Sequence, residues 1–215
     1  MANIWLNSTV KTYTDHFGIK TNPLVLDVGS RDGRDGYELA QRIGATDYSG
    51  VVLFECNPVS IETIKQNYPQ ATLITEAILD VSGKTLDFMQ IHGDQNYVGS
   101  STLNTKRNDN WIKETSTIKV KTKRLDEVIE ELGHQNTEID ICKIDVEGYS
   151  FEVLEGMGKY IRNTKVYHIE TEIASYARNK TNVDIALYMQ ERGYKCTSIE
   201  GEWLPNIIDQ VWVRQ

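Results

Sequence analysis

Short apolar runs alternate with amphipathic patterns along most of the chain, and this alternation constrains the fold more than any other feature. Strand-like runs lie at 24–28, 50–55, 71–75, 139–145, 165–170 and 194–199. Helical patterns separate most of these runs, near 34–43, 59–67, 124–133, 149–162 and 182–192. Strands that alternate with helices join through right-handed crossovers and form a mostly parallel sheet with helices on both faces. We therefore predict an α/β fold.

Two segments between the third and fourth predicted strands interrupt this alternation. Residues 84–91 and 117–123 alternate apolar and polar side chains, as half-exposed strands do. They bracket a polar stretch from His92 to Thr115, which is long for a plain connection. We predict a β insertion over 84–123 that could act as a lid on the acceptor side of a site.

The two ends of the chain carry their own patterns. Apolar residues at helical spacing predict an N-terminal helical extension over 1–23. At the other end, a turn separates the run at 194–199 from Ile207–Val213, which predicts a hairpin with an antiparallel last strand. Because no Pro-, Gly- or Ser-rich linker divides the chain, residues 1–215 are predicted to form one domain.

Charge and composition argue against several classes of protein. The net charge of −8 disfavours a nucleic-acid partner, because affinity for phosphate backbones needs clustered lysine and arginine. No apolar stretch approaches the roughly 20 residues that span a bilayer, and the first residues lack the pattern of a signal peptide. The three cysteines are unclustered, so they indicate neither a disulfide framework nor a zinc site. We expect a soluble cytoplasmic protein with no membrane partner.

A glycine-rich loop follows the first predicted strand. The strand ends in Asp27, and the loop carries glycines at 29, 33 and 36. A dinucleotide-binding loop needs glycine at 29, 31 and 34 so that the backbone can approach a pyrophosphate, whereas this chain has Arg31 and Arg34. An acid at the strand end favours a nucleoside with a positively charged end instead.

Acidic residues recur where the predicted strands end, which is the edge at which open α/β sheets bind ligands. They are Asp27, Glu55, Glu76, Asp145 with Glu147, and Glu170 with Glu172. A carboxylate at Glu55 could accept both hydrogen bonds from a ribose diol. Glu76 could bind an adenine amino group, and the neighbouring Ala77 and Ile78 could pack against the ring.

Each of these residues alone also has a purely structural interpretation. Acids near the start of a helix are stabilised by the helix dipole, which would explain Glu55, Asp145 or Glu147 without any ligand. His168 fits a mixed core position better than a catalytic one, because it alternates with Ile169 along its strand. The recurrence of acids at one sheet edge, in the order that a nucleoside requires, favours the functional interpretation.

The chain resembles an FkbM-type methyltransferase over roughly residues 24–172. The matching motifs are Leu26-Asp27-Val28-Gly29 with Gly33, Phe54-Glu55-Cys56-Asn57-Pro58, Glu76-Ala77-Ile78 with Gly83, Ser100-Ser101-Thr102-Leu103, Val120 through Leu125-Asp126, and Lys143-Ile144-Asp145-Val146-Glu147-Gly148. The last of these is the most specific. The resemblance implies a Rossmann-like class I fold with a seven-stranded sheet, and S-adenosylmethionine as the cofactor, with S-adenosylhomocysteine as product.

The resemblance and the acids together give the predicted site. The cofactor-binding residues would be Asp27, Gly29, Ser30, Arg31, Asp32, Gly33, Glu55, Cys56, Asn57, Glu76, Ala77, Ile78 and Asp145. Within this set, the resemblance places Asp27 and Gly29 at the methionine end of the cofactor and Glu55 at its ribose. Asp145 and Glu147 are the candidates for a catalytic base or for orienting the acceptor, with Lys143 as an ion-pair partner. A divalent cation could bridge Asp145, Glu147 and Glu170, but their spacing does not demand one, so no metal site is predicted.

The predicted function is O-methylation of a hydroxyl on a sugar or another polyhydroxylated small molecule. The acceptor would then be a small molecule or a glycan. Two alternatives remain open at this stage. One is a methyltransferase that acts on nitrogen or on a protein side chain. The other is a non-catalytic binding module that retains the fold, because a fold alone gives no warrant for an activity.

Overall fold

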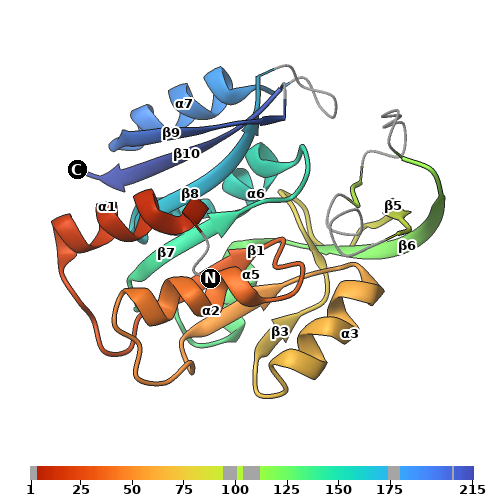
Figure 1. The fold of residues 1–215 in the computed structure, drawn as a ribbon, viewed down its shortest axis with the longest axis horizontal. Helices are drawn as coiled ribbons and strands as arrows, with labels where there is room; N and C mark the ends of the chain where they lie inside the picture. The colour runs from red at the N-terminus through yellow and green to blue at the C-terminus, as the bar shows by residue number, and fades with distance from the viewer. Residues whose placement is uncertain (1–3, 94–100, 104–111, 174–179, 205) are drawn as a thin grey trace.

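The computed structural model describes residues 4–93, 101–103, 112–173, 180–204 and 206–215, with only the backbone described at residue 4 and at 202–204. Within these ranges the main sheet has seven strands in the order β3-β2-β1-β7-β8-β10-β9 (Figure 1). The strands are β1 (Val25–Val28), β2 (Val51–Phe54), β3 (Thr72–Ile74), β7 (Ile139–Ile144), β8 (Thr164–Glu172), β9 (Tyr194–Leu204) and β10 (Ile207–Arg214). The predicted seven-stranded α/β architecture is confirmed.

Strand direction also follows the prediction. Neighbouring strands from β3 to β8 pair in parallel, and β10 pairs antiparallel with both β8 and β9. Chain order runs outward from β1 to β2 and β3 on one side, and from β7 to β8 on the other. The order therefore reverses between β1 and β7, and this switch point is where α/β sheets bind ligands.

Helices cover both faces of the sheet, which explains why β1, β2 and β7 are buried throughout and mostly apolar. The helices are α1 (Asn7–Phe17), α2 (Arg34–Arg42), α3 (Pro58–Asn67), α5 (Leu125–Glu131), α6 (Ser150–Gly156) and α7 (Asn182–Glu191), with 3-10 turns η1 (Ile4–Leu6) and η2 (Gly158–Asn163). Residues of α1, α2 and α3, including Tyr13, Leu39 and Ile64, form one core cluster. Residues of α5, α6 and α7 belong to the other.

The predicted helix over 149–162 is wrong in one respect, because the chain forms α6 and then the separate turn η2. Gly158 has φ +52, a left-handed backbone conformation that ends a regular α-helix. An apolar pattern continues across this break, and it is the pattern that predicted a single helix.

The β insertion forms a small sheet of its own. The strands β4 (Ala77–Ile78), β6 (Thr115–Lys123) and β5 (Thr85–Ile91) pair in that order. Both predicted strands of the insertion are present, and β4 adds a short strand directly after β3. Residues 94–100 and 104–111, which hold most of the polar stretch from His92 to Thr115, lie outside the described residues.

The N-terminal helical extension packs against the main sheet through a buried carboxylate. Asp140, at the start of β7, accepts hydrogen bonds from the hydroxyl of Tyr13 at 2.8 Å and from the backbone N–H of Leu24 at 2.8 Å. The ammonium groups of Lys20 and Lys165 lie 2.6 and 2.8 Å from its two oxygens. These contacts hold α1 beside β8 and β10 (Figure 1).

Among the described residues, no helix combines the length and the apolar composition that a bilayer crossing would need. The cytoplasmic location stays a prediction.

Candidate functional site

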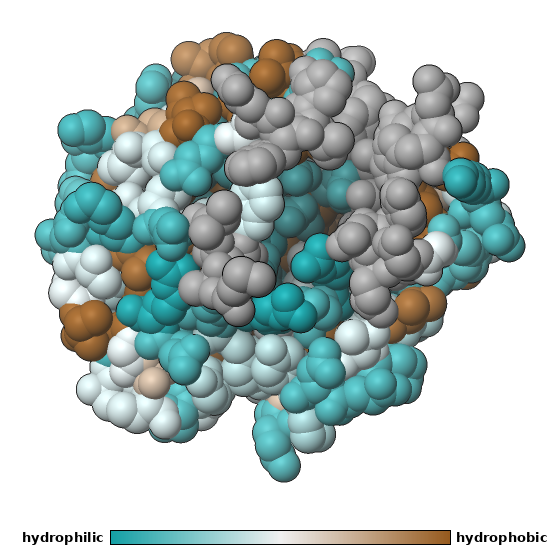
Figure 2. All heavy atoms as spheres, in the orientation of Figure 1, coloured by the Kyte–Doolittle hydropathy of each residue, from teal (hydrophilic) through white to brown (hydrophobic). Residues whose placement is uncertain are grey.

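A cavity of about 410 Å³ opens at the carboxyl edge of the sheet, around the switch point between β1 and β7. Residues that follow β1, β2 and β7, together with the end of β8, supply most of its wall. Figure 2 shows hydrophilic residues at the centre of this face, between the grey segments. The site predicted from the strand ends therefore coincides with a real cavity.

The loop after β1 lines this cavity with its backbone. Gly29 has φ +83, and a Cβ atom added there would lie 1.7 Å from the carbonyl oxygen of Asp145. Glycine is therefore required at position 29 for the loop to approach the end of β7. The hydroxyl of Ser30 donates to the carbonyl of Asp27 at 2.6 Å and accepts from the N–H of Phe54 at 2.9 Å, which fixes the loop against β2.

Among the described residues, two that are not glycine have positive φ, and both line the cavity. They are Arg31, with φ +51, and Glu147, with φ +53. This conformation costs free energy in residues with a Cβ atom, and it concentrates at binding sites. The strain turns the backbone N–H of Arg31 toward Glu55, 2.9 Å from its Oε2.

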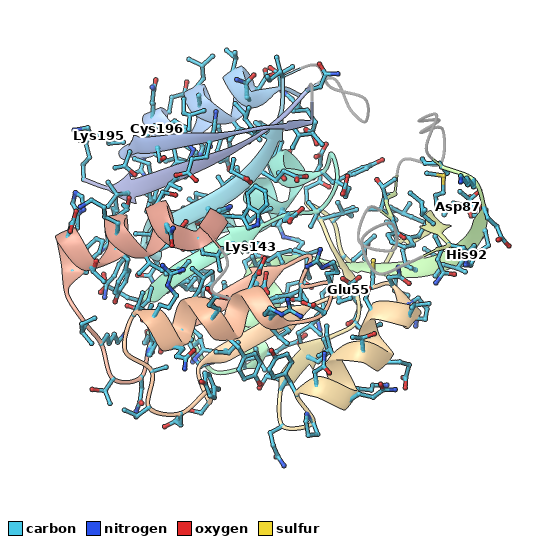
Figure 3. The ribbon with its side chains drawn as sticks, in the orientation of Figure 1. Glu55, Asp87, His92, Lys143, Lys195 and Cys196 are labelled. Carbon is cyan, nitrogen blue, oxygen red and sulfur yellow. The ribbon has the colours of Figure 1, made fainter. Side chains whose placement is uncertain are left out.

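Glu55 is held at the cavity wall by two backbone donors. Its Oε2 accepts from Arg31 and its Oε1 accepts from the N–H of Asn57 at 2.8 Å. Burial raises the pKa of Glu55 to about 7, although these backbone hydrogen bonds oppose the shift. The group is therefore an acceptor in a fixed orientation, as binding a diol requires. Figure 3 shows Glu55 and Lys143 near the middle of the molecule.

Lys143 lies at the centre of a cluster of carboxylates. Its Nζ is 3.1 Å from Asp145, 3.5 Å from Asp35 and 3.7 Å from Asp27. Burial lowers the pKa of Lys143, but the three carboxylates outweigh that effect and hold the pKa well above its ordinary value. The ammonium group therefore stays charged and neutralises part of the acidity beneath the cavity.

Asp27 is completely buried, and it does not line the cavity. Its Oδ2 accepts from the N–H of Gly36 at 3.0 Å, and burial raises its pKa to about 6. Asp27 is thus not part of the cavity wall, and its contact with the methionine end of a cofactor stays a prediction. Its side chain contacts the first turn of α2 at Gly36 and lies 3.7 Å from the ammonium group of Lys143.

Asp145 also belongs to a cluster of three acids with Glu147 and Glu170. One carboxylate oxygen from each of Asp145, Glu147 and Glu170 lies within 4.8 Å of the others. Burial and the neighbouring acids Asp145, Glu147, Asp209 and Glu172 raise the pKa of Glu170 well above its ordinary value. The cluster can hold a proton, and its oxygens also suit a divalent cation such as magnesium.

The opposite end of the cavity is less polar. Ala77, Ile78 and Phe88 line it, and Ala77 and Phe88 belong to a small core cluster with Val120. Asn57 joins this end to the insertion, because its Oδ1 accepts from the side chain of Gln90 at 2.8 Å and its Nδ2 donates to Ser101 at 3.1 Å. The small sheet thus closes the apolar end of the cavity.

The structure brings most of the predicted residues together. The predicted residues that line the cavity are Gly29, Ser30, Arg31, Glu55, Cys56, Asn57, Glu76, Ala77, Ile78, Lys143, Asp145 and Glu147. Asp27, Asp32 and Gly33 do not line it. Asp32 accepts from the N–H of Arg34 at 3.1 Å, and Gly33 is the N-cap residue of α2, with φ +80°. These residues shape the start of the helix rather than the cavity wall.

Several lining residues had no local signal in the sequence. Trp5 in η1 and Asp209 in β10 come from opposite ends of the chain, and only the fold brings them to one cavity. His168 of β8 is buried as expected and also lines the cavity. Its Nδ1 is 2.7 Å from the hydroxyl of Thr9, and its Nε2 is 3.3 Å from Asp209.

Comparison with known sequences gives two matches. The sequence model of the methyltransferase FkbM domain matches residues 27–196. The 2-O-methyltransferase NoeI of Sinorhizobium fredii is 26% identical over 161 residues, a match that covers 70% of this chain and 64% of that protein. The chain thus spans less than two thirds of this relative.

Comparison with solved structures supports the fold class. The chain is similar to magnesium protoporphyrin IX methyltransferase of Synechocystis, with a TM-score of 0.51 and 12% identity for the structure with bound S-adenosylmethionine. That match covers 98% of this chain and 78% of the other. The same enzyme with bound S-adenosylhomocysteine gives a TM-score of 0.52. The predicted class I methyltransferase fold is thereby confirmed.

Proposed function

Because the chain belongs to the FkbM methyltransferase family, we propose that it transfers a methyl group from S-adenosylmethionine to a hydroxyl of a sugar or another polyhydroxylated small molecule. The family is the one that the sequence motifs predicted. The observation that carries the proposal is the position of Glu55, oriented by two backbone N–H groups between the apolar end of the cavity and its acidic end.

The cavity offers complementary groups for each part of the cofactor. Ala77 and Ile78 would pack against the adenine ring, and Glu76 would accept from its amino group. Glu55 would accept from the ribose hydroxyls. The loop at Gly29 and the carboxylate of Asp145 would hold the methionine end, whose ammonium and sulfonium groups are cationic and are stabilised by nearby acids.

Methyl transfer to a hydroxyl is an in-line displacement. A lone pair of the acceptor oxygen forms the new bond to the methyl carbon, and the electron pair of the breaking C–S bond stays on sulfur. The hydroxyl proton must leave, and the acids at 145, 147 and 170 provide a place for it. We assign Glu147 or Asp145 as the base, because burial and the neighbouring acids raise the pKa of Glu170 and favour its protonated form.

O-methylation is favoured over methylation of nitrogen by the similarity to a relative named as a 2-O-methyltransferase. Physical chemistry points in the same direction. An amine must be neutral to attack the methyl group, and a cluster of carboxylates would stabilise its protonated, unreactive form. A hydroxyl gains from the same cluster, because a carboxylate can accept its proton.

The test measures transfer of a labelled methyl group from S-adenosylmethionine to a panel of methyl glycosides, polyols, amines and peptides. We expect label on oxygen in glycosides or polyols. Glu147→Gln should lower kcat by about 100-fold, while the affinity for S-adenosylmethionine changes little. Exposed Glu62 provides the control variant Glu62→Gln, which should behave as the natural protein does.

Two results would contradict the proposal. Label that appears only on nitrogen or on a protein side chain would favour the first alternative function. Failure of both S-adenosylmethionine and S-adenosylhomocysteine to bind in titration calorimetry would favour a binding module that retains only the fold.

A further inference from the structure

A second cavity of about 1010 Å³ lies along the outer side of α2, away from the first. Its wall comes from α2, from the turn before β2 and from the segment between α3 and β3, all in the lower half of Figure 1. None of its lining residues lines the first cavity. We call it the tyrosine groove, and its lining residues include Tyr37, Tyr48, Tyr68, Gln41, Asn67 and Gln70.

Three aromatic rings form one wall of the tyrosine groove. Tyr37 stacks on Tyr68 with ring centroids 4.0 Å apart and ring planes 13° apart. Tyr48 lies against the same Tyr37 ring, with centroids 4.7 Å apart, and it is 40% exposed. A tyrosine offers an apolar ring face together with a hydroxyl that can donate or accept. The wall thus combines flat apolar surface with hydrogen-bonding groups.

The charged groups of the groove are largely paired within the protein. Arg42 contacts Glu38 at 3.3 Å and donates to the side chain of Asn7 at 2.7 Å. Arg34 lies 3.5 Å from Asp32. The two arginines in the lining are matched by two lining acids, Glu38 and Asp47. An anionic ligand would find no excess of positive charge here.

The remaining polar wall is made of amides and hydroxyls. Gln41, Asn67 and Gln70 are exposed, and Ser49 and Thr72 complete the lining. Amide side chains donate and accept at the same time, as do hydroxyls. The groove therefore presents uncharged hydrogen-bond donors and acceptors next to the aromatic rings.

From this combination we infer that the tyrosine groove binds a neutral saccharide chain. A pyranose ring has apolar C–H faces, which suit the exposed ring of Tyr48, and a rim of hydroxyls, which suit the amides. A lipid chain would need a continuous apolar wall, and apart from the tyrosine rings Pro69 is the one apolar residue in the lining. A charged polymer would need unpaired charge.

The inference rests on the proposed function, in which the acceptor is a saccharide. A second saccharide site would let the enzyme bind an acceptor chain of more than one sugar unit. The glycine loop lies between the two cavities, because a Cβ atom at Gly33 would be 3.0 Å from the ring of Tyr68. Arg31 of this loop lines the first cavity and Arg34 lines the groove.

The test is an NMR titration of the isotope-labelled protein, without cofactor, with the neutral chains maltohexaose, cellohexaose and xylohexaose and with the anionic chain hexagalacturonate. We expect at least one neutral chain to shift the backbone signals of Tyr48, Gln41 and Gln70. Tyr48→Ala should weaken this binding by about fivefold or more, because an aromatic contact is lost. Tyr48→Phe retains the ring and should stay within about twofold.

Three outcomes would overturn the inference. They are no shift with any neutral chain, tighter binding of hexagalacturonate than of the neutral chains, and equal affinity in Tyr48→Ala and the natural protein. The proposed function is tested separately, by S-adenosylmethionine binding and by methyl transfer to a monosaccharide glycoside in Tyr48→Ala. Groove binding without any methyl transfer would count against the proposed function alone.

Discussion

The Glu55 carboxyl group titrates near neutral pH, because burial raises its pKa from the ordinary 4.5 to about 7. A carboxylate accepts both hydrogen bonds of a ribose diol, whereas a protonated carboxyl accepts them less strongly. We therefore predict that affinity for S-adenosylmethionine rises as the pH rises through about 7, by roughly tenfold in total. Titration calorimetry at about pH 6 and about pH 8 measures the change.

Glu55→Gln is the variant that isolates this effect. It should bind the cofactor about tenfold more weakly at about pH 8 and lose most of the pH dependence. Glu62→Gln changes an exposed acid on α3 in the same way and should leave both quantities unaltered. If Glu55→Gln kept the full pH dependence, the titrating group would be another residue.

Asp27 makes a second residue-level prediction, about stability rather than binding. Its pKa is raised from 3.8 to about 6 in the folded protein, so the fold favours its protonated form. This contribution is complete below about pH 4 and is lost as the pH rises through about 6. Asp27→Asn removes the titration, so the free energy of unfolding should fall less between about pH 4 and about pH 7 than in the natural protein.

Urea denaturation at those two pH values provides the measurement. The expected difference between the proteins is on the order of 1–3 kcal/mol, since each unit of pKa shift corresponds to about 1.4 kcal/mol. Asp47 is exposed and provides the control variant Asp47→Asn. Parallel curves for Asp27→Asn and the natural protein would show that Asp27 does not titrate in this range.

At the scale of elements, the glycine loop gives a prediction with a matched control. Gly29 and Gly83 have similar left-handed φ angles of +83° and +74°. A Cβ atom at Gly29 would collide with the carbonyl of Asp145, whereas nothing lies within 4 Å of one at Gly83. Gly83→Ala should therefore cost about 1 kcal/mol from backbone conformation alone.

Gly29→Ala should cost several times more, because the end of β7 must also move away from the loop. It should abolish detectable binding of S-adenosylmethionine, while Gly83→Ala binds it normally. Thermal unfolding and titration calorimetry give the two readouts. Equal destabilisation by both variants would mean that the close approach of Gly29 to Asp145 does not constrain the fold.

Elements with a regular sequence period were predictable, and those set by tertiary contacts were not. The strands β1, β2 and β7 are mostly apolar because both faces of the sheet are covered, and their apolar runs are visible in the sequence. The break at Gly158 depends on a single backbone conformation. The two-residue strand β4 is too short to have a period, and it exists because β6 offers an edge to pair with.

The candidate site was likewise predictable only where a local sequence pattern identifies its residues. Acids at strand ends identify the sheet edge, so Glu55, Asp145 and Glu147 were found at the cavity wall. Asp27 occupies an equivalent position in the chain, but its side chain is fully buried against Gly36 and does not line the cavity. The strand β1 has four residues, and an alternating pattern of side chains over so few residues does not predict whether Asp27 faces the cavity or the core.

At the scale of the whole molecule, the N-terminal extension contributes to the cavity. Trp5 and Leu6 line it, and Thr9 of α1 contacts His168 at 2.7 Å. The buried Asp140 holds this extension in place. Burial opposes the charged form of Asp140, but Lys165 and Lys20 outweigh it and lower its pKa. The network therefore stabilises the protein above the ordinary pKa of an aspartate and is lost as the pH falls through the lowered value.

Asp140→Asn tests this coupling between the extension and the sheet. It leaves the ammonium groups of Lys20 and Lys165 without the buried carboxylate, so the free energy of unfolding should fall by about 3 kcal/mol. Glu138 is the matched control, because it pairs with Arg214 and lies near Lys165 but is half-exposed. Glu138→Gln should cost less than about 1 kcal/mol.

The same variant should also change the cavity, because the extension carries part of its wall. We expect KM for the acceptor to rise in Asp140→Asn at a temperature where the protein remains folded, while the affinity for S-adenosylmethionine changes little. The reason is geometric, since Thr9 of the extension contacts His168 in β8, the strand that carries Glu170 of the acidic cluster. Glu55 and the glycine loop are held by β1 and β2 instead. An equal loss of cofactor and acceptor affinity would mean that the extension supports the whole cavity and not one end of it.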